Sequence, residues 1–376
     1  MFDLPPELVF AILDLTEDGS VLFALRSLSK RFDAMVTPLA FRTLTVRDSV
    51  RSAGALVSLQ NCDTAITSAV QEIVFKAENQ HIDSVDGQAA RDAVYAAFSR
   101  LSKFSNLKSL RLQFYHGWSL TPSQDVPPLH LQTTLFGALA AHRPPPLASL
   151  TIHNLVALPA PAYTETAFQN IFRTLITLHL STYPEPYLDN DNAYDRDFPP
   201  LRDFWNICVP HMLKSAPHLT SLTIHSDRWI GVGPVVPFAD IHLPALAALS
   251  LRYFVFHPAD PATDVLEFIV RHKGTLTHLE LENCTVYGGP NHRKECPRPW
   301  HVMLRRLERE LPRLRSLRVT VTGFAFLAPR PCGYLLLVPW NSYSHTVADV
   351  FGVRAQDDDA LASLISRVES RRAMEL

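Results

Sequence analysis

Cysteine is scarce in this sequence, and the few that occur form no recognisable pattern. The 376 residues include five cysteines, an odd number, and no two of them make a C-x-x-C pair. A disulfide framework is therefore not expected, nor are the paired ligands of a zinc ribbon. Widely spread single thiols favour a reducing compartment, so we expect a cytoplasmic or nuclear protein. The five residues are Cys62, Cys208, Cys284, Cys296 and Cys332.

Long hydrophobic runs are also missing. A membrane-spanning helix needs roughly 18 or more apolar residues, and the apolar run at residues 334–340 is far too short. The first residues mix Asp3 and Glu7 with apolar side chains and lack a basic segment, so no signal peptide is expected. We therefore expect no membrane insertion.

The sequence has no excess of either charge. Its 35 basic and 37 acidic side chains give a formal net charge of −2, which offers no global electrostatic reason for binding nucleic acid or an anionic membrane. Hydrophobic residues make up 47% and charged residues 19%, a balance typical of a folded chain rather than a disordered one. The length allows a large core and two or three domains.

Catalytic motifs are absent as well. The sequence contains no G-x-S-x-G, H-E-x-x-H, P-loop or kinase signature. The acidic run at residues 189–192 begins like a calcium loop, but Tyr194 replaces the required glycine and Pro200 the required glutamate. One cluster of metal-ligand types, Cys284, His292, Cys296 and His301, fits no zinc spacing and has basic neighbours. We expect no active site, no metal and no cofactor.

The N-terminal stretch is rich in local signals. Pro5 and Pro6 suit the first turn of a helix, and the residues after them place apolar side chains at helical spacing up to Leu13. A second helix is predicted around residues 21–33, with Val21, Leu22, Leu25, Leu28 and Phe32 on one face. Pro38 is expected to break the helical pattern, and residues 41–46 alternate like a short strand.

This order of motifs, LPPEL, IL, LxxL, SLSKRF and PLAFRTL, resembles the F-box, the helical module that binds the Skp-type adaptor of cullin–RING ubiquitin ligases. The resemblance covers about residues 2–46, with a departure at residues 16–20, where many F-boxes carry a tighter leucine-rich turn. It implies an adaptor-binding surface formed by Leu4, Pro5, Leu8, Ile12, Leu13, Leu22, Leu25 and Phe32. The alternative is an N-terminal helical cap that shields the end of a repeat array.

The rest of the chain repeats one pattern, L-x-x-L-x-L. The step between successive middle leucines varies from 27 residues (Leu222 to Leu249) to 44 (Leu178 to Leu222), and the shorter steps approach the period of leucine-rich repeats. A weaker instance is Val70-Ile73-Phe75. The full instances begin at Leu107, Leu147, Leu175, Leu219, Leu246, Leu276 and Leu314.

Helical patterns lie between these strands, so the sequence predicts an α/β solenoid. They cover residues 86–104, 129–142, 164–172, 201–215, 263–272 and 298–311. We expect a right-handed leucine-rich-repeat fold over residues 47–345, with parallel strands on the concave face and helices outside, followed by a capping helix within residues 346–376. Together with the F-box at residues 1–46, the chain resembles the F-box/leucine-rich-repeat proteins of fungal type.

In that family the F-box recruits the ligase and the repeats hold the protein to be ubiquitinated, so the resemblance implies a non-enzymatic substrate-recognition subunit. Its partners would be a Skp-type adaptor, through it a cullin, and a protein client. A non-catalytic scaffold, whose F-box serves packing or a ligase-independent adaptor complex, is the alternative. A third is an enzyme whose site is assembled across the arc.

The outward strand positions and two long insertions are the candidate client-binding residues. Polar residues between and after the inward leucines form two columns, and residues 183–195 and 229–238 form insertions with aromatic side chains. Both insertions could equally pack on their own repeats, and Glu280 and Glu282 could bind a basic segment or neutralise Arg252 and Arg318. The candidates are Arg111, His153, His179, His225, Arg252, Glu280, Glu282, Arg318, Tyr187, Tyr194 and Trp229.

Overall fold

The computed structural model describes most of the chain. The described residues are 13, 19–61, 64–78, 85–115, 127–142, 144–182, 199–231, 234–257, 260–290, 296, 298–321, 332–337, 343–346 and 351–374. No helix among them is long and apolar enough to cross a membrane. The first predicted helix, apart from Leu13, lies outside these residues.

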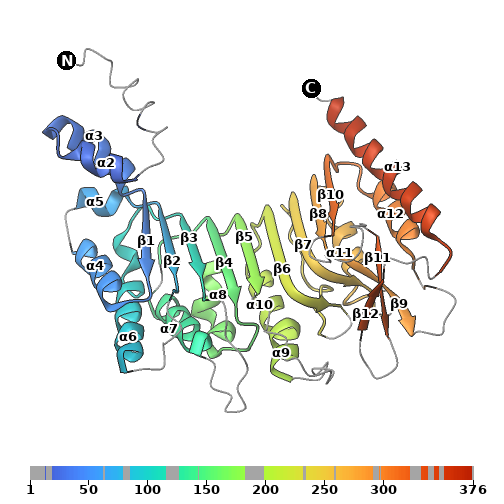
Figure 1. Ribbon diagram of the computed structural model, residues 1–376, viewed down its shortest axis with the longest axis horizontal. Coiled ribbons are helices and arrows are strands. Elements are labelled where there is room, and N and C mark those ends of the chain that lie inside the picture. Colours follow the sequence, from blue (N-terminus) through green and yellow to red (C-terminus); the bar gives the residue numbers. More distant parts are fainter. Residues whose placement is uncertain are drawn as a thin grey trace.

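A long parallel sheet runs through the whole molecule (Figure 1). Each L-x-x-L-x-L segment forms a strand that pairs with its neighbours in register, which confirms the strands predicted from the repeat. The strands are β1 (Thr43–Arg47), β2 (Glu72–Lys76), β3 (Ser109–Gln113), β4 (Ser149–Leu155), β5 (Thr177–Thr182), β6 (Ser221–Ile230), β7 (Ala248–Phe256), β8 (His278–Glu282) and β10 (Ser316–Thr320).

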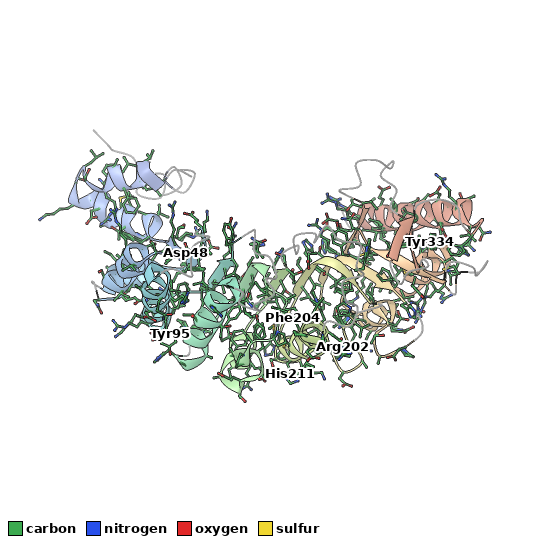
Figure 2. The ribbon with its side chains drawn as sticks, turned by 60° about the horizontal axis from the view of Figure 1, so that its bottom comes forward. Asp48, Tyr95, Arg202, Phe204, His211 and Tyr334 are labelled. Atoms are coloured by element: carbon green, nitrogen blue, oxygen red, sulfur yellow. The ribbon has the colours of Figure 1, made fainter. Side chains whose placement is uncertain are left out.

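Helices form a layer along the outer, convex side of the arc, where Tyr95, Phe204 and His211 are seen in Figure 2. Two of them, α4 (Val50–Gln60) and α5 (Thr64–Ala69), were not predicted. The predicted ones are α6 (Val85–Phe98), α7 (Pro127–Ala141), α8 (Thr166–Phe172), α9 (Pro199–Asp203), α10 (Val209–Lys214), α11 (Val265–Arg271) and α12 (Trp300–Glu310). A π-helical turn at Phe204–Cys208 joins α9 to α10.

The core lies between these two layers. The two inward positions of each strand stack across the sheet into columns of leucine and isoleucine, and Leu110, Leu178 and Leu222 have no exposed surface. Burying one such side chain contributes about 1.5–3 kcal/mol. Phenylalanines extend the columns beneath the sheet, since the ring of Phe114 contacts those of Phe75 and Phe136 at centroid distances of 6.3 and 5.9 Å. No single repeat could bury this surface alone.

The sheet divides near its C-terminal end. Tyr253 and Asn283 follow the repeat positions of β7 and β8 with φ of 61° and 50°, in the left-handed region that turns the backbone sharply. Beyond these turns β7 pairs with β9 (Thr285–Pro290), which pairs with β11 (Gly333–Leu337), and β12 (Tyr343–Thr346) closes that branch antiparallel. The periodicity of the repeat did not predict this branch, although the apolar run at residues 334–340, which reads as a strand, overlaps β11.

The N-terminal described helices differ from the prediction in two ways. The expected single helix is two helices, α2 (Gly19–Arg26) and α3 (Lys30–Ala40), because the Ser29 hydroxyl accepts a hydrogen bond from the Phe32 amide and starts a new helix. Pro38 lies inside α3 rather than ending it. It is tolerated there because the carbonyl it leaves unpaired, on Ala34, belongs to an exposed residue that water can reach.

The boundary of the first predicted domain also moves. The expected boundary after residue 46 falls inside β1, and β1 pairs in parallel with β2 over residues 43–47. The sheet therefore begins at Thr43, and only the helices before it lie outside the sheet and helix layers. α4 then covers the first strands, because Ala53 and Leu56 belong to the main hydrophobic core.

The predicted C-terminal capping helix is α13 (Arg354–Ala373). Leu361, Leu364 and Val368 are buried, whereas Ile365 is 37% exposed. A buried carboxylate fixes this helix: Asp357 accepts hydrogen bonds from the His301 amide (2.8 Å) and from the Tyr334 hydroxyl (2.5 Å). One side chain thus joins α13 to α12 and to β11.

Asp357→Ala should destabilise the protein by about 3 kcal/mol, because it leaves buried donors on His301 and Tyr334 without an acceptor. Urea denaturation followed by circular dichroism measures the change. Asp359→Ala, on an exposed position of the same helix, is the matched control and should shift the midpoint little. Equal midpoints for the two variants would contradict the role given to Asp357.

Gly231→Ala should also destabilise the fold, by about 2–3 kcal/mol. Gly231 has φ of 128°, and a Cβ there would lie 2.4 Å from the Val255 carbonyl oxygen of the neighbouring strand. Gly137→Ala is the control, since a Cβ at that helical position meets nothing within 4 Å and alanine favours the helix. Thermal unfolding of the two variants should move in opposite directions.

Candidate functional site

The strand positions that point away from the helices form one continuous surface, which we call the inner face. Its two predicted columns are confirmed by the strand register, which aligns Arg111 with Thr151, Thr151 with His179, and so on to Arg318. Buried and accessible residues alternate along β3, β4 and β5, because the side chain at every second position of a strand points away from the core. The two columns are polar from β3 to β10, whereas the inner face also includes the apolar Val74 on β2 and Ala248 on β7.

Three histidines lie side by side at the centre of this face, and we call them the histidine row: His153, His179 and His225. The ring centroids of His153 and His179 are 4.7 Å apart, and those of His179 and His225 are 5.2 Å apart. They come from the adjacent strands β4, β5 and β6. The sequence predicted each of them on the surface, and the structure brings all three into contact.

The histidine row is uncharged at neutral pH. Partial burial, and then its neighbours His153, His225 and Arg111, lower the pKa of His179 to about 4. Burial also lowers the pKa of His153 and of His225, with Arg111 adding to the effect on the first. A charge on any one imidazole is unfavourable mainly because burial removes it from water; nearby cations add to this effect, whereas Glu282 and Glu280 oppose it at His225.

A chain of hydrogen bonds leads from the histidine row to the far end of the inner face. The Ser250 hydroxyl donates to Glu280 at 3.0 Å and lies 3.0 Å from Nε2 of His225. Because the hydroxyl proton is committed to Glu280, the imidazole must donate from Nε2. Ser250, His225 and Glu280 have the residue types of a catalytic triad, but a triad needs the imidazole to accept the serine proton. This order of contacts positions side chains and does not activate Ser250.

The acidic pair on β8 neutralises its basic neighbours. Glu280 lies 3.2 Å from Arg318 and Glu282 lies 3.6 Å from Arg252. Of the two alternatives that the sequence left open, the structure favours internal pairing over a free acidic site. These pairs are partly exposed, with 69% of the Arg318 side chain accessible, so each contributes little to stability.

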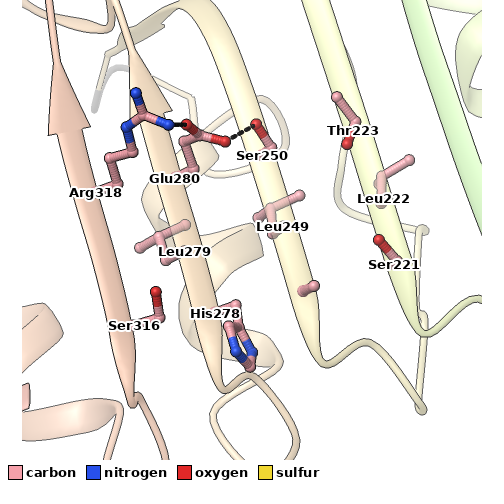
Figure 3. Close-up of a pocket in the computed structure, with 11 residues that line it drawn as sticks. Ser221, Leu222, Thr223, Leu249, Ser250, His278, Leu279, Glu280, Ser316 and Arg318 are labelled. Carbon is pink, nitrogen blue, oxygen red and sulfur yellow. Dashed lines mark hydrogen bonds and ion pairs between the residues drawn. The ribbon is translucent and has the colours of Figure 1, made fainter.

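The inner face is hollowed between β6 and β10. The hollow has a volume of about 240 Å³, and Figure 3 shows Arg318, Glu280 and Ser250 joined along its rim. Four of its eleven lining residues carry hydroxyl groups, and three are buried leucines of the core. The lining residues are Ser221, Leu222, Thr223, Ala248, Leu249, Ser250, His278, Leu279, Glu280, Ser316 and Arg318.

The aromatic insertions contribute less than expected. Tyr187 and Tyr194 lie outside the described residues. Trp229 lies in β6 rather than in a loop, and its ring packs edge-on against Tyr253 at a centroid distance of 5.1 Å. Val236 and Phe238 are buried. Over these residues the second insertion therefore packs on its own repeat, which was the alternative to a client-binding loop.

The described cysteines and histidines form no metal site. No group of three His, Cys, Asp or Glu side chains converges within the described ranges, and His292 lies outside them. Burial raises the pKa of Cys208 to about 11 and that of Cys284 to about 12, so both thiols stay protonated at neutral pH. Protonated, buried thiols are poor nucleophiles and poor ligands.

The N-terminal helices expose apolar side chains. Val21, Phe23 and Leu28 are 42%, 48% and 66% exposed. Leu13 and Leu22, predicted to contact a partner, are instead buried against Val36 in a small cluster, with Leu25 and Phe32 partly buried beside it. The predicted Leu4, Pro5, Leu8 and Ile12 lie outside the described residues. Phe23 was missed because it falls off the predicted apolar stripe.

The stability of the protein should fall as the pH drops from 7 to 5. The folded state holds His179 neutral down to about pH 4, whereas the unfolded chain binds the proton near pH 6.5. The unfolded state therefore gains protons first, and this stabilising contribution is complete above pH 6.5 and lost towards pH 4.

Urea denaturation across this range should show a smaller loss for His179→Gln than for the wild type. His218→Gln, at an exposed histidine, is the matched control. An equal pH dependence for wild type and His179→Gln would contradict the environment assigned to the histidine row.

Comparisons with known proteins give little beyond this geometry. No protein-family model matches the chain, and no curated protein matches its sequence. Among solved structures, the crystal structure of the Rad7 and Elc1 complex in yeast is similar over 88% of this chain and 91% of the matched chain, with 13% sequence identity and a TM-score of 0.27. That TM-score is too low to support an argument, so the α/β architecture rests on the strands and helices described above.

Proposed function

We propose that this chain is a substrate-recognition subunit of an SCF-type cullin–RING ubiquitin ligase. In this role the N-terminal helices bind a Skp-type adaptor, and the inner face binds a protein client. Ubiquitin chemistry belongs to the partner complex, and this chain supplies proximity and orientation. It works in the cytoplasm or the nucleus and needs no cofactor.

The observation that carries the proposal is that the N-terminal helices have a core of their own. Leu13, Leu22 and Val36 form a cluster that is separate from the continuous core of the repeats. A helical cap would instead share its apolar side chains with the first repeat, because covering that repeat is its purpose. A separate cluster favours an added module.

The capping role is already filled by another element. α4 follows β1 and places Ala53 and Leu56 in the repeat core. Gln60 of the same helix donates to the Ala97 carbonyl at the end of α6 at 2.8 Å. α4 therefore closes the N-terminal end of the solenoid, which leaves α2 and α3 free for a different task.

The exposed apolar side chains of α2 and the turn after it supply a contact surface. Leu28 is 66% exposed and Val21 is 42% exposed, in a segment whose motifs resemble the F-box. Each aliphatic side chain fully buried on a partner contributes about 1.5–3 kcal/mol. A module too small to bury all of its own apolar surface is stabilised when a partner protein covers the exposed part.

Leu28→Asp should abolish or strongly weaken binding of a purified Skp-type adaptor to the full chain. An unpaired charge buried at the interface costs several kcal/mol, or more than tenfold in affinity. Because Leu28 is exposed, the substitution leaves the fold intact, which circular dichroism verifies. A pull-down or surface plasmon resonance measures the binding.

Val302→Asp is the matched control, since Val302 is 46% exposed on α12, in the C-terminal part of the chain. It should bind the adaptor as the wild type does. Adaptor binding unchanged by Leu28→Asp would contradict the proposed surface. Absence of binding by the wild type would favour the alternative, a scaffold whose N-terminal helices serve another complex.

A further inference from the structure

The repeat positions in the middle of the inner face contain no carboxylate. The parts of β3, β4, β5 and β6 that pair in register contribute three inner-face positions each; beyond them β6 continues to Ile230 and carries Asp227, whose carboxylate accepts a hydrogen bond from the Thr182 hydroxyl at 2.6 Å. All twelve side chains are at least partly accessible, and none is Asp or Glu. They are Ser109, Arg111, Gln113, Ser149, Thr151, His153, Thr177, His179, Ser181, Ser221, Thr223 and His225.

This tract is rich in hydrogen-bond donors and in groups that carry or accept positive charge. Arg111 stands at its N-terminal edge with 51% of its side chain accessible, and the histidine row follows on the next three strands. Arg252, on β7, stands beyond the other edge, in register with His225. Five consecutive strands therefore each present one such side chain.

Every carboxylate around these repeat positions has a partner: those at the two ends of the tract have an arginine, and Asp227 on β6 has the Thr182 hydroxyl. Glu72 on β2 lies 3.7 Å from Arg111, and Glu280 and Glu282 on β8 lie against Arg318 and Arg252. The pair with Arg111 is long and accessible to water, so it holds the guanidinium weakly. An anion arriving over β3–β6 meets no negative side chain among the repeat positions of those strands.

We propose that the inner face of β3–β6 is the docking surface for an acidic segment of the client, a short extended run of Asp or Glu residues. This inference rests on the proposed function and specifies the chemistry of the client. Arg111 pairs with one carboxylate, while imidazole N–H groups and the hydroxyls of Thr151 and Thr223 donate to others or to the peptide carbonyls. Three interstrand steps of about 4.8 Å span roughly 14 Å, enough for about four extended residues.

Binding of such a segment takes up protons. A carboxylate placed beside the histidine row stabilises the imidazolium form that burial and the neighbouring cations now disfavour. Proton and peptide binding then reinforce each other, because coupling between two binding events is reciprocal. The charged and titratable groups around His179 are Arg111 on β3, His153 on β4, His225 and Asp227 on β6, Arg252 on β7, and Glu280 and Glu282 on β8.

The test uses the full chain and three capped hexapeptides, acetyl-hexaglutamate-amide, the neutral hexaglutamine and the basic hexalysine. Isothermal titration calorimetry at low salt gives each affinity at pH 6.0 and 7.5. Two buffers of different ionisation enthalpy give the protons taken up. We expect hexaglutamate to bind at least about tenfold more tightly than hexaglutamine, and about tenfold more tightly at pH 6.0 than at pH 7.5, with proton uptake.

Arg111→Gln and His179→Gln should each weaken hexaglutamate by about fivefold or more. Arg111 is accessible, so its substitution keeps the fold even if His179→Gln disturbs it. Arg315→Gln, which removes an arginine that precedes β10 and lies outside the tract, is the control and should bind as the wild type does.

Several outcomes would overturn the inference. They are equal binding of hexaglutamate and hexaglutamine, tighter binding of hexalysine, no binding of hexaglutamate, or binding unaffected by Arg111→Gln. The adaptor measurement with Leu28→Asp is independent of all of these. A chain that binds the adaptor through Leu28 but ignores hexaglutamate would keep the proposed ligase role and lose only the acidic docking surface.

Discussion

Register between parallel strands is the constraint on which the rest of this structure depends. Each repeat places two leucine-type side chains on one face of its strand, and the pairing of Leu110 with Leu150 and of Leu150 with Leu178 stacks them into columns. A slip of one residue would turn every such side chain to the solvent. The same register that closes the core fixes, without further cost, which polar residues meet on the opposite face.

The histidine row is a direct product of that register. His153, His179 and His225 come from segments separated by insertions of different lengths, yet adjacent strands bring their rings within 4.7 and 5.2 Å. Burial, and then the closeness of the rings, keeps the imidazoles neutral, so each of them retains one N–H donor. The surface thereby combines a low charge at rest with a capacity to become cationic when an anion approaches.

The repeat motif predicted the strands, most helices and the two polar columns correctly, because alternation and helical spacing follow from local geometry. The sequence did not reveal the break at Ser29, where one capping hydroxyl outweighs a continuous apolar stripe. Nor did it reveal the branch at Tyr253 and Asn283, since neither residue type demands a left-handed backbone. The contacts around Ser250 and Asp357 depend on side chains distant in sequence, so they could be found only in three dimensions.

The joint between the N-terminal helices and the sheet is short and packed. α3 ends at Ala40 and β1 begins at Thr43; between them Phe41 is buried, and its ring meets that of Phe23 at 5.4 Å. The Gln71 amide donates to the Arg42 carbonyl beside it. The N-terminal helices are thus connected to the sheet rigidly and not through a flexible linker. In the proposed complex this rigid connection would hold the bound client at a fixed distance from the adaptor. Client lysines that lie at the matching distance would then be modified in preference to nearer or farther ones.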